Sequence, residues 1–274
     1  MQTQSINHSN PNSGFTIALK DWRKVRKMSQ LDLSLEAQVS QRHLSWLETG
    51  RAKPSREMVI RLADTLSIPN RDRNRLLGLA GFAPLFVESE LDAPVMKMVT
   101  DVLEKMLTNH DPYPAIVMDR RWNLKMKNAS ADRLFELFGN TAQILQDIGD
   151  DGQFNIARLS FHPKGLRRFA SNWDEIAPSF FARLRREAIE LNDPVAISLL
   201  NELAPHVEDY VAEQHYPASL SPLLTLHYSV NGHDLKLVSV LSSFGSAQDV
   251  TATELKIETF YPADDITAAY FESS

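Results

Sequence analysis

Apolar residues recur at helical spacing through residues 29–54, and polar residues fill the positions between them. Leu33 and Ala37 fall on one face of a first short helix, and Leu44 and Leu47 fall on one face of a second. Because only a few residues separate the two sets, the pattern predicts two short helices joined by a tight turn.

Residues at the ends of these segments mark where each helix begins and ends. Ser29 can cap the first helix, and Asp32 three residues later completes a capping-box pattern. Ser40 can cap the second helix, and Gly50 supplies a left-handed stop. We therefore expect a helix after Ser29 and another after Ser40.

Three more amphipathic segments flank this pair. The spacing predicts a helix over 15–27, another from Ser55 to about residue 66, and a third that starts near Asn70.

Two prolines and a glycine then interrupt the periodicity over 81–94, which indicates a domain boundary. We expect a disordered polar tail over 1–14, an all-α domain over 15–81, a linker over 82–94 and a second domain over 95–274. The residues expected to point inward in the three helices are Leu19, Trp22, Val25, Met58, Leu62, Leu66, Leu76, Leu77 and Ala80.

The second domain begins with an amphipathic stretch. Residues 95–107 have the spacing of a helix, with Val95, Val99, Val102, Leu103 and Met106 on its apolar face. Three roles are open for it: a connection between domains, a dimer seam, or a lid on the next domain.

Strands and helices then alternate. We expect strands over 115–118 and 122–126, a turn between them over 119–121, and a helix from Asn128. Helices over 154–159, 166–191 and 194–203 follow. Two alternating runs, 223–230 and 235–244, flank Asn231-Gly232, a strong hairpin signal, and a last strand over 255–262 precedes a short tail. This order predicts an α+β domain with a five-stranded antiparallel sheet covered on one face by helices.

Composition narrows the class of protein. Of the 274 residues, 43% are hydrophobic and 23% are charged, a composition typical of globular proteins. A chain of this length is long enough for two domains. The chain has no 18-residue apolar run, no signal-peptide pattern at its start, and no cysteine. We expect a cytoplasmic protein that neither enters a membrane nor forms disulfides.

Charge is divided unevenly along the chain. Residues 15–81 contain 13 Lys and Arg against 7 Asp and Glu, whereas the remainder contains 16 against 28. A basic module joined to an acidic one suits a first domain that meets phosphate and a second that does not.

The outer face of the second short helix carries Gln41, Arg42, Ser45 and Trp46. Glutamine and arginine pair bidentately with adenine and guanine in the major groove. We therefore interpret residues 29–54 as a helix-turn-helix whose second helix reads DNA bases with these four side chains. Two roles are open for Trp46, which either packs on a thymine methyl group or covers its own helix.

Residues 15–82 resemble the five-helix DNA-binding domain of the phage-repressor and XRE family of transcriptional regulators. The stretch HLSWLETGRAKPSREMVIRLADTL is closer to one branch, the MmyB-like regulators, whose C-terminal part is a PAS-like ligand-binding domain. Three later phrases fit that branch as well: LSFHPKGL, FGSAQDVT and IETFYPAD. The positions that carry the family resemblance are Leu19, Arg23, Ser29, Gln30, Leu33, Ser40, Leu44, Leu47, Glu48, Gly50, Arg51 and Pro54.

The resemblance implies roles for several residues. Arg23 and Glu48 would form a buried bidentate ion pair, and Gln30, Arg51, Lys53 and Ser55 would contact DNA phosphates. A homodimer would read a pseudo-palindromic operator with half-sites about one helical turn apart. Many family members place glycine in the turn where this chain has Gln38, which would cost about 1 kcal/mol if the backbone there is left-handed.

For the second domain, the resemblance implies a pocket for a fatty-acid-like or other small apolar ligand. His162, Arg167 and Arg168 are candidates to meet a carboxylate head group. Ordinary core packing is the competing interpretation of each apolar residue. The candidate lining is Met118, Trp122, Met126, Phe161, His162, Trp173, Phe180, Phe181, Tyr228, Phe244 and Phe260.

The sequence contains few features that would indicate an enzyme. The histidines at 206, 215, 227 and 233 lack metal-ligand spacing, and the chain has no HExxH, P-loop or GxGxxG motif. Ala80-Gly81 resembles the self-cleavage dipeptide of some phage repressors, but no segment looks like their Ser–Lys peptidase domain. We expect a regulator without catalysis, metal or cofactor, whose second domain either binds a ligand or serves only as a dimerisation or docking module.

Overall fold

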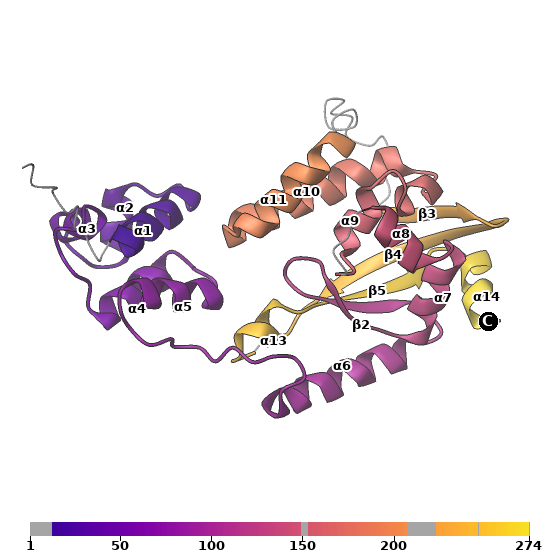
Figure 1. Ribbon diagram of the computed structural model, residues 1–274, viewed down its shortest axis with the longest axis horizontal. Coiled ribbons are helices and arrows are strands. Elements are labelled where there is room, and N and C mark those ends of the chain that lie inside the picture. Colours follow the sequence, from indigo (N-terminus) through magenta and orange to yellow (C-terminus); the bar gives the residue numbers. More distant parts are fainter. Residues whose placement is uncertain (1–12, 149–152, 208–222, 246, 274) are drawn as a thin grey trace, which may run out of the picture. The chain divides into compact units, whose positions relative to one another are not determined.

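A computed structural model describes residues 13–148, 153–207, 223–245 and 247–273 (Figure 1). Its contacts divide the chain into two compact units. One holds the described residues up to Glu88 together with residues 189–192, and the other holds residues 89–188 and the described residues from Asp193 onward. Most of the expected tail lies outside the described residues, but Ser13 and Gly14, placed in that tail, begin the first helix.

The N-terminal unit is a bundle of five helices, as predicted. Its apolar core includes Leu19, Leu33, Leu44, Leu47 and Leu62, which are all completely buried. In the fourth helix Val59 occupies the core and Met58, expected there, is only partly buried, as is Ala80 after the fifth. The helices are α1 (Ser13–Val25), α2 (Gln30–Glu36), α3 (Gln41–Glu48), α4 (Arg56–Thr65) and α5 (Asn70–Leu79).

The helix ends follow the predicted chemistry. Ser29 closes a reciprocal capping box with Asp32, and Ser40 and Ser55 accept hydrogen bonds from the N–H groups of the first turns of α3 and α4. Gly50 has a φ of +73°, and Gln38 is also left-handed at +55°. The turn between α2 and α3 therefore carries the strain that glycine would avoid.

The C-terminal unit contains the predicted five-stranded antiparallel sheet, in the order β2-β1-β5-β4-β3. Asn231 and Gly232, both with positive φ, form the two-residue turn between β3 and β4. Trp122, at a φ of +69°, belongs to the turn before β2 and not to the strand. The strands are β1 (Ala115–Met118), β2 (Leu124–Lys127), β3 (Thr225–Val230), β4 (His233–Ser242) and β5 (Lys256–Pro262).

Helices cover both faces of this sheet, not one as expected (Figure 1). Ile116 and Met118 point into the larger core, to which α7 to α11 and α14 contribute side chains. Ala115 and Val117 point to the opposite face, where they pack against α6 (Lys97–His110). The helices over the first face include α7 (Ala129–Leu137), α8 (Thr141–Asp147), α9 (Ile156–Phe161), α10 (Trp173–Leu191), α11 (Pro194–Leu203) and α14 (Asp265–Glu272), with 3-10 turns η2 (Leu166–Phe169) and η3 (Ala204–His206).

Several expected elements differ from the structure. The helix predicted over 166–191 is interrupted after η2, because Ala170 pairs with Tyr228 on β3 and Ser171 donates its N–H to the His227 carbonyl. The expected C-terminal tail contains α14, which buries Phe271 completely.

On the predicted helix over 95–107, Val95, Val102 and Met106 are exposed, and α6 begins only after the short η1 turn (Pro94–Met96). A further short helix, α13 (Val250–Glu254), precedes β5. In the described part of the chain, no helix is both long and apolar enough to cross a membrane.

Candidate functional site

The outer face of α3 presents the residues expected to read bases. Gln41 and Arg42 are exposed in its first turn, Ser45 is half-buried, and Trp46 is 37% exposed. The Arg42 guanidinium lies over the Trp46 ring, with Cζ 4.6 Å from the ring centroid. This stacking limits the rotamers of Arg42 and holds its charge close to the outer face of α3. Trp46 thus packs along its own helix here, and its contact with thymine stays a prediction.

A buried ion pair fixes α3 to α1. Arg23 Nε donates to Glu48 Oε1 at 2.6 Å, and Arg23 Nη2 donates to Oε2 at 2.9 Å, the bidentate geometry expected from the sequence. The Glu48 side chain is completely buried and that of Arg23 is 14% exposed. Burial alone would raise the pKa of Glu48, but hydrogen bonds from Arg23 and Gln30 lower it below its usual range. The pair therefore stays charged and sets the tilt of α3.

The expected phosphate contacts fall into two groups. Arg51 and Lys53 are exposed beyond the end of α3, and exposed Ser55 uses its hydroxyl oxygen to cap α4. Gln30, whose phosphate contact stays a prediction, donates an amide N–H to Glu48 Oε2 at 2.8 Å. Its first role in this structure is therefore to support the ion pair.

A cavity of about 300 Å³ lies in the C-terminal unit, between the inner sheet face and the helices above it. Leucine, isoleucine and phenylalanine residues make up half of its lining. The apolar residues of the wall include Ile116, Ala131, Leu134, Phe135, Phe138, Ile156, Leu166, Ile176, Leu223, Leu224, Leu226 and Val238.

Of the eleven predicted lining residues, four line this cavity: Trp173, Phe180, Tyr228 and Phe260. Met126 and Phe244 were assigned to the wrong side, since they pack beside α6 on the opposite face of the sheet. The remaining predicted residues are not part of the wall. Met118, Trp122 and Phe161 are buried in the core behind it, Phe181 packs against that core, and His162 stacks edge-on against His206.

Of the three candidates for a head-group contact, only Arg167 lines the cavity. Its Nη1 donates to the His206 carbonyl at 3.1 Å. Arg168 is exposed and stacks on Phe169 instead. Burial lowers the pKa of His162, as do the charges of His206 and Lys164, so His162 is poorly suited to act as a cation.

Sequence reasoning missed two charged residues in the wall, Glu258 on β5 and Arg183 on α10. Glu258 is 5% exposed, and burial raises the pKa of its carboxyl. The Arg183 guanidinium lies 4.8 Å from the centroids of both the Trp122 and Phe180 rings. The register of β5 was the available signal, since Glu258 shares a strand face with Phe260, which was predicted to line the pocket.

Neither unit offers an obvious metal centre: within the described ranges, no three His, Cys, Asp or Glu side chains are grouped to hold an ion. Comparison with family models matches residues 99–273 to the MmyB-like transcription regulator ligand binding domain and residues 19–69 to a helix-turn-helix domain. The chain belongs to the MmyB-like transcription regulators. No curated protein matched it.

In this MmyB-like regulator, α3 lies within the helix-turn-helix match, and the cavity lies within the ligand-binding match. The chain therefore joins a DNA-binding module to a ligand-binding module, and both matched families are parts of transcription regulators.

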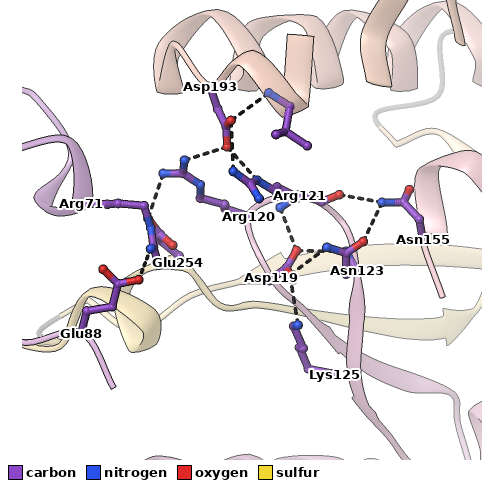
Figure 2. Close-up of polar contacts among 11 residues, drawn as sticks. Arg71, Glu88, Asp119, Arg120, Arg121, Asn123, Lys125, Asn155, Asp193 and Glu254 are labelled. Carbon is purple, nitrogen blue, oxygen red and sulfur yellow. Dashed lines mark hydrogen bonds and ion pairs between the residues drawn. The ribbon is translucent and has the colours of Figure 1, made fainter. Parts of the chain in front are cut away.

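A charged network in the MmyB-like domain braces the turn between β1 and β2 (Figure 2). Arg120 Nη2 donates to Asp193 Oδ2 at 2.6 Å and Arg120 Nη1 to Glu254 Oε1 at 3.0 Å, while Arg121 Nε also donates to Asp193. Although burial opposes ionisation, these arginines and the Val195 N–H lower the pKa of Asp193 to about 2. Asp193 also caps α11, so the network ties that helix to the turn.

Proposed function

We propose that this regulator binds double-stranded DNA through α3 as a homodimer on a pseudo-palindromic operator. We further propose that a small apolar, fatty-acid-like ligand in the cavity of the second domain alters that binding. The observation that carries the DNA part is the exposed row of Gln41, Arg42 and Trp46 on a helix fixed from behind by the Arg23–Glu48 pair.

The charge distribution supports the DNA part. The basic surplus of residues 15–81 would attract phosphate, and the exposed Arg51 and Lys53 flank the base-reading row. A single small module contacts few base pairs, and two copies related by a two-fold axis would read half-sites about one helical turn apart. Such a regulator acts in the cytoplasm.

The cavity supports the ligand part. Its volume is at the lower end of the range of small-molecule pockets, and its wall is mainly apolar with a few polar groups. For the ligand to regulate DNA binding, it must bind one arrangement of the dimer more tightly than the other.

Two measurements on the full-length protein test this function. Fluorescence anisotropy with labelled genomic fragments should give salt-dependent binding that Gln41→Ala and Arg42→Ala weaken. Mass spectrometry of a solvent extract of the purified protein should reveal a lipid near one molecule per chain. An extract without lipid, with DNA binding intact, would favour the docking alternative, for which exposed Met98 and Val102 on α6 offer an apolar surface.

A further inference from the structure

An acidic side chain lies at the centre of the inner sheet face. Glu258 pairs with Ile116 on β1 and with Leu241 on β4, so it projects from the middle of the sheet into the apolar core. It is 5% exposed and lines the cavity beside Ser239. In the ranges that the structure describes, no lysine or arginine forms an ion pair with it.

The surroundings of Glu258 favour a neutral carboxylic acid. Burial raises its pKa, and the other charged or titratable groups that face it are Arg183, Glu187, Lys256 and Tyr228. The charge of Arg183, a hydrogen bond with Ser239 and the charge of Lys256 oppose the rise without cancelling it, and Lys256 is already paired with Glu187. A protonated Glu258 keeps an O–H donor available inside the cavity.

The opposite wall supplies a cation with one unused hydrogen-bond donor. Arg183 projects from α10 into the cavity, and its buried Nε has no hydrogen-bond partner among the described residues. Its guanidinium contacts the Trp122 and Phe180 rings, which hold it without neutralising its charge. A buried donor left without an acceptor is unfavourable, so this wall is suited to a ligand that brings one.

We propose that Arg183 and Glu258 form the head-group site of the cavity and select a monoanionic, carboxylate-bearing amphiphile. This rests on the proposed ligand-binding function. Arg183 supplies the positive charge, Glu258 in its neutral form donates one hydrogen bond to the ligand carboxylate, and the apolar wall holds the alkyl chain.

The assignment has a consequence for pH. Because its pKa is raised by burial, Glu258 keeps its proton to a higher pH than an ordinary glutamate does. Once Glu258 ionises, it repels the ligand carboxylate and no longer donates. Affinity for the anion therefore falls as pH rises, and affinity for an uncharged analogue does not.

Calorimetric titration of the full-length protein with decanoate and with 1-decanol tests the proposal. At about pH 6 we expect decanoate to bind at least about 10-fold more tightly than decanol. Arg183→Gln should remove that preference and leave decanol binding unchanged, whereas Arg183→Lys should keep most of it. Arg186→Gln, which alters an exposed arginine on the same helix, is the matched control.

Glu258→Gln completes the test, because glutamine resembles the neutral acid and cannot ionise. This variant should retain the preference for decanoate, and it should abolish the fall in decanoate affinity that the unaltered protein shows as the pH is raised through the ionisation of Glu258. Decanol binding reports that each variant has a folded cavity. If the unaltered protein binds decanoate and decanol equally tightly, the proposed head-group site is wrong, but the cavity still binds an apolar ligand. Binding of neither probe would overturn the ligand part of the proposed function as well.

Discussion

Replacing Glu48 with glutamine should destabilise the DNA-binding unit more than any surface substitution. The change removes the negative charge but keeps the shape of the side chain. Arg23, with its side chain 14% exposed, is left as a buried cation, and only its hydrogen bond to the Met28 carbonyl at 2.9 Å is untouched.

The size of the effect follows from the burial of the pair. Breaking a buried ion pair on one side costs about 3–5 kcal/mol, because the remaining charge is desolvated without compensation. For a domain of this size, about 3 kcal/mol lowers Tm by roughly 12 °C or more. Replacing both residues, as Arg23→Met with Glu48→Leu, should cost less than either single change, since no charge stays buried.

Hydrogen exchange during urea unfolding, followed on peptides from α1 to α5, measures the stability of the N-terminal unit separately from that of the C-terminal unit. Glu36→Gln, at an exposed glutamate of α2, is the control and should change stability by less than about 0.5 kcal/mol. The pKa of Glu48 is lowered by folding, so the contribution of its charge is full above about pH 4.3 and is lost as pH falls further. A loss below 1 kcal/mol for Glu48→Gln at neutral pH would refute the reasoning.

Four other substitutions test separate features of the two units. Arg42→Ala should reduce the discrimination between bases at one position of the DNA site by about 1–3 kcal/mol. Lys53→Ala should instead weaken binding to all DNA sequences equally and reduce the slope of log K against log salt concentration by about 1. Binding assays over a series of salt concentrations measure both effects. Asp193→Asn should lower stability by about 2 kcal/mol at pH 7, a difference that shrinks as pH falls from about 4 toward 2, in thermal melts. Gln38→Gly should raise the stability of the N-terminal unit by about 1 kcal/mol, because φ there is +55°, and an unchanged melting temperature would contradict this.

Local signals were enough to predict the helices of the first unit. Ser29, Ser40 and Ser55 each precede an apolar periodic segment, and each side chain accepts the hydrogen bond expected of a cap. The Arg23–Glu48 pair was predictable only through family resemblance, since 25 residues separate its members. Spacing alone does not tell which distant side chains meet.

The second unit was harder because both faces of its sheet are covered. Met118 and Met126 lie on adjoining strands and are equally apolar, yet one enters the larger core and the other packs beside α6. Glu258 was overlooked because a glutamate in a strand usually faces water. Its spacing from Phe260 on the same strand was the available signal, and the register with Ile116 shows that Glu258 points inward. The break before α10 depends on pairing with β3, a contact that helical periodicity cannot reveal.

Selection of genomic fragments by the full-length protein at low salt tests the central claim most directly. The account predicts enrichment of a two-fold symmetric site with half-sites about 10 base pairs apart, and loss of that site when Gln41 and Arg42 are both replaced by alanine. Retention of no fragment, or enrichment of the same site by the doubly substituted protein, would contradict it.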